Sequence, residues 1–212
     1  MSDNKPDNAE TSPETPETVP DPARRRLTGA ALGAGAVFTL SSQPVWASRC
    51  TISGMMSGNL SKPKEKCDGC TPGYWKQCQH LDSWIPTGFK PWDAFNTVFG
   101  VSQYVDATGK PYTLLDVMGG VSGSMDKGGK DKDKMCSALP AGYLDNPMGR
   151  DPISTNLGFH AVAALLNAAH PNVNFGYTSG DIINLFRSNY LTKPAALKDS
   201  FEMLNERGCP LN

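Results

Sequence analysis

Three of the six cysteines lie in one short segment, residues 67–80, and this segment constrains the fold more than any other part of the chain. It reads CDGCTPGYWKQCQH, so a C-x-x-C pair precedes a turn and a third cysteine precedes His80. The Thr-Pro-Gly sequence predicts the turn, because proline presets φ and glycine permits positive φ. Tyr74 and Trp75 follow it directly. Such a segment becomes rigid only through cross-links, either disulfide bonds or a metal ion, and through burial of its rings.

The N-terminal part of the chain predicts export. Residues 1–22 are rich in Pro, Glu, Asp, Thr and Ser, and such a composition buries too little apolar surface to fold, so we expect a disordered leader. Three arginines at 24–26 precede an apolar run over 27–40, which is shorter than the roughly 20 residues of a membrane span. Residues 45–47, Val-Trp-Ala, fit a signal-peptidase site. We therefore expect 1–47 to be a leader plus a twin-arginine-type signal peptide, with a short membrane anchor as the alternative.

The remaining residues, 48–212, have a length typical of one domain. We expect a mainly α fold: a single mature helical domain, braced by disulfide bonds, with long irregular loops and little or no sheet. Residues 119–150 hold many Gly, Lys, Asp and Ser residues and predict a mobile loop insertion.

The formal net charge of −1 provides no basic field for nucleic acid. We expect a soluble product in the periplasm or the extracellular space, without a stable membrane span after cleavage, and a partner that is an extracellular or envelope protein.

Five segments carry helical patterns. They are 92–99, 113–118, 156–169, 179–190 and 194–207. The third is apolar almost all round, which predicts a buried central helix, with Ser154 or Thr155 as its cap. Thr178 and Asp181 predict a capping box, and Gly100 predicts the end of the first helix.

The cysteines have two interpretations. An even number of cysteines in an exported chain predicts disulfide bonds, and six cysteines allow 15 pairings. The alternative is a zinc or copper site built from Cys67, Cys70, Cys78 and His80, because thiolates and imidazole are the ligands of tetrahedral zinc. The C-x-H spacing is tighter than that of usual zinc pairs, and cysteine–zinc sites are commoner in reducing compartments. We therefore predict disulfide bonds, with no resident metal or cofactor.

The histidines offer little chemistry. Only His80, His160 and His170 are present. His160 and His170 fall on the apolar helix, where a histidine is typically a core or capping residue, and the helix C-terminus should favour the charged form of His170. The sequence contains no G-x-S-x-G, no H-E-x-x-H and no phosphate-binding glycine loop. We assign no catalytic and no cofactor-binding residue.

Two functional hypotheses follow. The first is an exported structural or interaction protein without enzymatic activity, in which Tyr74, Trp75, Trp84 and Trp92 form a contact surface. Large aromatic side chains usually belong to a core, so burial of these rings is the competing interpretation. The second hypothesis is an exported metal-binding or hydrolytic enzyme that uses the cysteine cluster with His80 and Asp82.

Five short sequence strings follow one another between residues 70 and 211: CTPGYWK, FxxVF, TLLDV, HAVAALLNA and GCPL. In this order they resemble a group of exported, largely uncharacterised bacterial proteins. The resemblance covers most of residues 70–211 and implies little about activity. Within the shared pattern only Cys70 and Cys209 are cysteines, so the resemblance implies that these two are bonded to each other. Each also lies beside a turn residue, Pro or Gly, which can hold the Cβ atoms at bridging distance. The remaining four would pair most simply as Cys67 with Cys78 and Cys50 with Cys136.

Overall fold

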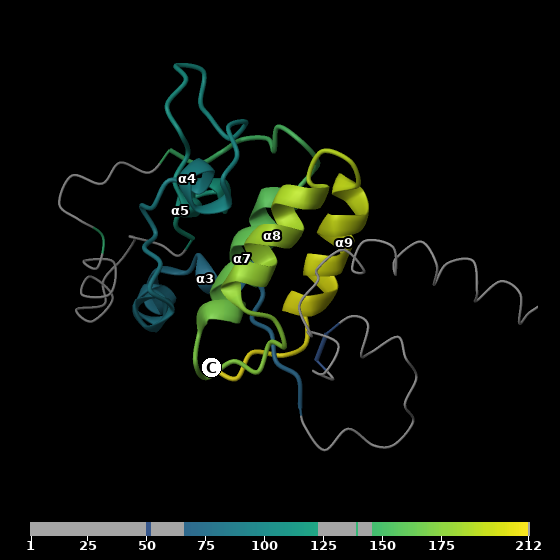
Figure 1. Cartoon of the computed structure of the whole chain (residues 1–212). Coiled ribbons are helices and arrows are strands. Elements are labelled where there is room, and N and C mark those ends of the chain that lie inside the picture. Colours follow the sequence, from purple (N-terminus) through teal and green to yellow (C-terminus); the bar gives the residue numbers. More distant parts are fainter. Residues whose placement is uncertain (1–49, 52–65, 123–138, 140–145, 212) are drawn as a thin grey trace, which may run out of the picture.

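The computed structural model describes residues 50–51, 66–122, 139 and 146–211 (Figure 1). The expected leader and signal peptide, 1–47, lie outside this part of the chain, as does most of the expected loop insertion at 119–150. Within the described residues, seven helices form and β-pairing is limited to isolated bridges, which confirms the mainly α fold class. None of these described helices has both the length and the apolar character needed to cross a membrane.

The α-helices are short in the first half of the described chain and longer in the second. In chain order the helices are α3 (Pro72–Trp75), the 3-10 helix η2 (Cys78–Thr87), α4 (Phe95–Phe99), α5 (Leu114–Val117), α7 (Leu157–Ala169), α8 (Ser179–Asn189) and α9 (Pro194–Asn205). Each predicted helical segment contains one of α4, α5, α7, α8 and α9. The 3-10 helix η2 was not expected, because a 3-10 helix with Pro86 inside it has no i, i+4 apolar repeat. The predicted helix at 92–99 begins only at Phe95, because Ala94 is extended and forms a β-bridge with Thr113.

The α7 helix lies at the centre of the core. Residues 160–167 of this helix are all buried, which confirms the predicted buried central helix. It contacts α3, η2, α5, α8 and α9. Figure 1 shows α8 along one side of α7 and α9 next to them. A helix that is apolar almost all round must be covered on every side, and this requirement draws elements from both halves of the chain around α7.

The N-terminus of α7 is capped from outside the helix, and the prediction of a cap at 154–155 is wrong. The N-cap residue is Asn156, in the left-handed conformation at φ 63°, and its side chain makes no capping hydrogen bond. The Asp151 carboxylate accepts hydrogen bonds from the backbone N–H groups of Ile153 (3.0 Å), Ser154 (3.2 Å) and Gly158 (2.6 Å). It also accepts one from the Tyr104 hydroxyl at 3.2 Å. A carboxylate satisfies several unpaired N–H groups at once, as a single hydroxyl cannot.

Gly158 lets this end of α7 approach its neighbours closely. A Cβ atom at this position would lie 2.6 Å from Val117 Cγ1 and 2.8 Å from Tyr104 Cε1. Both distances are shorter than packed carbon atoms tolerate, so any larger residue would push α5 away from α7.

The short-range caps agree with the sequence. Thr178 and Asp181 form the predicted capping box, with Asp181 N–H donating to Thr178 Oγ1 at 3.2 Å and Thr178 N–H donating to Asp181 Oδ2 at 2.9 Å. A second box joins Thr113 and Asp116 at the start of α5. Gly100 ends α4 at φ 64°, as predicted. These contacts span three or four residues, which is why the local sequence specifies them.

The predicted disulfide between Cys70 and Cys209 is confirmed. Their Cα atoms lie 4.3 Å apart, and the bond joins residues 139 positions apart in the sequence. An antiparallel bridge between Gly69 and Gly208 runs beside it. The bond therefore ties the start of the described core to the chain that leaves α9.

The other two predicted pairings are wrong, because Cys50 is bonded to Cys67. Arg207 explains where Cys50 lies: its guanidinium donates to the carbonyl oxygens of Cys50 and of Phe175. Cys78 sits elsewhere, at the start of η2, where its N–H donates to the Ser122 carbonyl at 3.1 Å. Cys78 is itself disulfide-bonded, and its partner lies outside the described residues, as does Cys136.

Candidate functional site

The Cys67–His80 segment does not offer the ligand set of the metal hypothesis. Cys67, Cys70 and Cys78 are all in disulfide bonds, so none provides a thiolate. The His80 ring stacks on Tyr74 with a centroid distance of 4.1 Å. Asp82 is exposed to solvent on η2. Among the described residues, no three His, Cys, Asp or Glu side chains are grouped so that they could hold a metal ion.

Three of the four rings of the predicted contact surface belong to the core instead. Trp75 is 0% exposed and Trp84 1% exposed, and Tyr74 is also buried. Each indole nitrogen has an internal acceptor: Trp84 Nε1 donates to the Trp75 carbonyl at 2.9 Å, and Trp75 Nε1 donates to Asn167 Oδ1 at 3.2 Å. The Tyr74 hydroxyl hydrogen-bonds with Ser83 Oγ at 2.9 Å. Because their polar atoms find partners inside the protein, these rings are buried without an unpaired polar group.

Asn167 is the polar centre of this core and was not singled out from the sequence. Its Oδ1 accepts from the Cys70 N–H at 2.9 Å, and its Nδ2 donates to the Cys70 carbonyl at 2.8 Å. Nδ2 also donates to Asn205 Oδ1 at 2.9 Å, while Asn205 Nδ2 donates to the His160 carbonyl at 3.0 Å. Asn167 and Asn205 are both 0% exposed. The signal that could have found Asn167 is its place as a lone amide within the apolar HAVAALLNA run.

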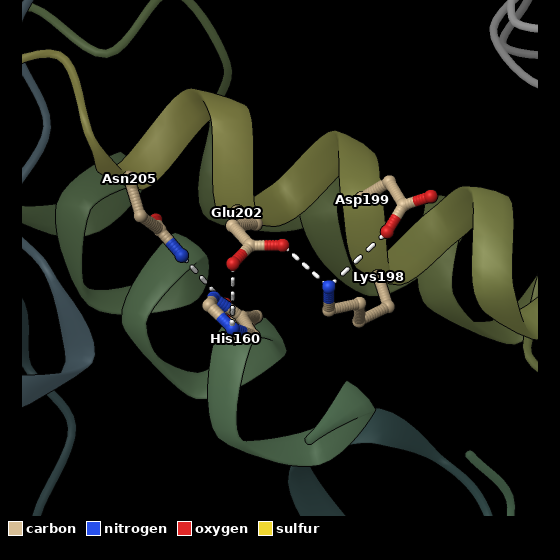
Figure 2. Close-up of polar contacts among 5 residues, drawn as sticks. All are labelled: His160, Lys198, Asp199, Glu202 and Asn205. Atoms are coloured by element: carbon tan, nitrogen blue, oxygen red, sulfur yellow. Dashed lines mark hydrogen bonds and ion pairs between the residues drawn. The ribbon is translucent and has the colours of Figure 1, made fainter. Parts of the chain in front are cut away.

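His160 faces the acidic side chain of Glu202 across the contact between α7 and α9 (Figure 2). His160 Nε2 lies 3.9 Å from Glu202 Oε1, and Lys198 pairs with the other Glu202 oxygen and with Asp199. His160 is buried, and its Nδ1 atom has no hydrogen-bond partner in the described part of the chain. Burial lowers the pKa of His160, although the Glu202 carboxylate opposes this shift. His160 is therefore a neutral interior side chain, and no described nucleophile hydrogen-bonds to it.

His170 differs from its expected charge state. Its Nδ1 accepts a hydrogen bond from the Asn172 N–H at 3.2 Å at the end of α7. Burial lowers the pKa of His170, so the charged form is disfavoured although the helix C-terminus attracts a cation.

We expect the free energy of unfolding to decrease as the pH falls below about 6.5, the usual pKa of an unfolded histidine. The lowered pKa values of His160 and His170 mean that the unfolded state binds more protons in this range. Their contribution is complete above the unfolded pKa and is lost as the pH falls through the folded pKa values. Urea titrations between neutral and mildly acidic pH measure it, and His160→Gln should flatten the profile. A stability that rises on acidification over this range would contradict the assignment.

The segment 85–92 is the remaining candidate for a contact site, because it keeps two large apolar side chains in solvent. Ile85 is 76% exposed and Trp92 37% exposed. Among the described residues, the other large apolar side chains that are exposed lie apart from it in sequence, at Val105, Leu191 and Met203. Trp92 is thus the one member of the predicted contact surface that reaches solvent.

Hydrogen bonds hold the segment 85–92 in one conformation. The Thr87 hydroxyl donates to the Trp84 carbonyl at 2.6 Å and accepts from the Phe89 N–H at 3.1 Å. At the other end, the Leu115 N–H donates to the Pro91 carbonyl at 3.0 Å. A surface segment that is fixed in this way loses little conformational entropy when it binds a partner.

No known protein family, curated protein or solved structure is significantly similar to this chain.

Proposed function

We propose that this protein is an exported, non-catalytic interaction module that contacts another protein of the cell envelope or the extracellular space. The observation that carries the proposal is the fixed segment 85–92, which presents Ile85 and Trp92 to solvent from a cross-linked core. Exposed aromatic side chains are enriched in protein contact surfaces, because a large rigid ring supplies contact area at a small entropic cost.

Export is supported by two independent features. Disulfide bonds persist in oxidising compartments and are rare in the cytosol, and this chain has at least the Cys50–Cys67 and Cys70–Cys209 bonds. Residues 24–47 carry the arginine, apolar and small-residue pattern of a signal peptide. Both features fit a route that delivers the chain to an oxidising compartment.

Changing the three arginines at 24–26 to lysine should abolish export while the charge stays the same, because a twin-arginine receptor reads the arginines themselves. Cell fractionation and intact mass measure the result, with the unchanged chain expected to begin at Ser48 after export. Export of the lysine variant at the unchanged level would contradict the signal assignment. Stoichiometric zinc or copper in the exported protein, lost on His80→Ala, would favour the metal-enzyme hypothesis instead.

A photo-crosslinking amino acid placed at Ile85 should capture an envelope or extracellular protein in the producing cell, whereas the same group at exposed Leu191 should not. The further change Trp92→Ala should reduce capture from position 85, because loss of a tryptophan that is a hot spot of an interface costs about 2 kcal/mol or more, about thirty-fold in affinity. Because Trp92 is only 37% exposed, its truncation should also lower the Tm, so circular dichroism at the assay temperature must show that the variant is folded. Equal adducts from positions 85 and 191, or none from position 85, would contradict the proposed surface.

A further inference from the structure

A cavity of about 350 Å³ is lined by no residue of the segment 85–92. It is bounded by the ends of α3 and α5, by residues 148–151 and by the N-terminal turns of α7. Its charged, apolar and polar lining includes Lys76, Met118, Met148, Arg150, Asn156 and Phe159. Gly119 and Gly149 on its border are exposed, so the cavity opens to solvent. Its volume falls within the usual range of small-molecule sites, about 300–1,000 Å³.

Two cations line this cavity without a carboxylate partner among the described residues. No ion pair or side-chain hydrogen bond joins Lys76 or Arg150 to another described residue. The one carboxylate in the lining, Asp151, is buried and is engaged by the Tyr104 hydroxyl and by N–H groups such as that of Gly158. With Lys76 and Arg150 against this one carboxylate, the lining carries more positive than negative charge, and the cavity attracts negative charge.

Lys76 is held in place at the wall. Its N–H donates to the Pro72 carbonyl at 3.2 Å, and its carbonyl accepts from the Ser122 N–H at 2.9 Å. Its ammonium lies 5.4 Å from the centre of the Phe159 ring, within the range of a cation–π contact. The cation is thus positioned beside an aromatic face, and a ligand can meet both.

The rest of the wall is apolar. Val117 and Met118 come from the end of α5, Met148 from the stretch before α7, and Phe159 from α7 itself. Methionine side chains adapt to the shape of a bound apolar group, and their sulfur atoms make favourable contacts with aromatic rings. An inorganic anion has no apolar group that could pack against these side chains.

We propose that this cavity binds a small organic anion with an apolar body: Lys76 and Arg150 contact the acidic group, Met148 and Phe159 contact the body, and the buried Met118 lies beneath the cavity floor and senses occupancy. Benzoate and octanoate represent this class. Inorganic phosphate keeps the charge without the body, and benzamide keeps a ring without the charge. The site is separate from the contact segment 85–92, so either can fail without the other.

The test follows the methyl signals of Met118 and Met148 by NMR in the exported protein labelled at its methionine methyl groups. Met118→Leu and Met148→Leu identify the two signals. Benzoate and octanoate should shift both signals in a saturable way, more tightly than phosphate or benzamide. Lys76→Met and Arg150→Met should each weaken binding about ten- to a hundred-fold, as expected for loss of a charged hydrogen bond.

Lys90→Met is the matched control, because Lys90 is an exposed lysine outside the cavity lining, and it should leave binding unchanged. Equal Tm values for the three lysine and arginine variants establish that the fold is intact. The proposal is overturned if Lys90→Met weakens binding as much as Lys76→Met, or if benzamide binds as tightly as benzoate. It is also overturned if phosphate binds as tightly as octanoate, or if neither methionine signal shifts.

Discussion

Replacing Asn167 with leucine should lower the free energy of unfolding by about 4 kcal/mol or more, because each buried polar group left without its partner costs about 1–3 kcal/mol. Leucine has the same number and branching of side-chain heavy atoms but removes the partner of the Cys70 N–H, the Cys70 carbonyl, Trp75 Nε1 and Asn205 Oδ1 at once. All of these atoms belong to buried residues, so water cannot replace the amide. Urea unfolding followed by tryptophan fluorescence measures the change.

Asn184→Leu is the matched control, because Asn184 is an exposed asparagine on the neighbouring helix α8. It should change the free energy of unfolding by less than about 0.5 kcal/mol, as is usual for a surface position. If Asn167→Leu lowered the free energy of unfolding as little as this control, the hydrogen bonds of Asn167 would not be what holds the segment around Cys70 to α7. The effects of Asn167→Leu and of a substitution at Cys70 on the free energy of unfolding should not be additive, because the two residues share hydrogen bonds.

Removal of the Cys70–Cys209 bond with a double alanine variant should destabilise the protein by about 5 kcal/mol, since the chain-entropy estimate grows with the length of the closed loop. The two cysteines are 139 positions apart. The Cys50–Cys67 bond closes a separation of 17, and the same relation assigns it about 3 kcal/mol. Urea unfolding of the two double variants, each measured against the unchanged protein, ranks the two bonds.

Loss of the Cys70–Cys209 bond should destabilise the protein more than loss of the Cys50–Cys67 bond. The Cys70–Cys209 bond joins the segment before α3 to the chain after α9, so its loss releases both ends of the described core. The Cys50–Cys67 bond holds only residues at the beginning of that core. A larger loss of stability from the Cys50/Cys67 variant would show that loop length does not control the contribution of these bonds.

The sequence determined those features that depend on neighbours along the chain. The capping box of Thr178 with Asp181 and the left-handed glycine at Gly100 each involve residues three or four positions apart. The burial of α7 was predictable for a related reason, because a run such as HAVAALLNA has no polar face to expose. The pairing of Cys70 with Cys209 is the exception, as it came from the resemblance and not from local spacing.

Only the tertiary structure decided the features that depend on residues distant in the chain. Arg207 donates to the carbonyl oxygens of Cys50 and Phe175 and so holds Cys50 where it bonds to Cys67 and not, as predicted, to Cys136. Asn167 supplies the acceptor that allows the Trp75 ring to be buried rather than displayed. The Trp75 donor and the Cys50 thiol are visible in the local sequence, but Asn167 and Arg207, which position them, are distant in the chain. The exposure of Trp92 likewise depends on the fold, and the cavity beside Lys76 exists only where the ends of α3, α5 and α7 meet.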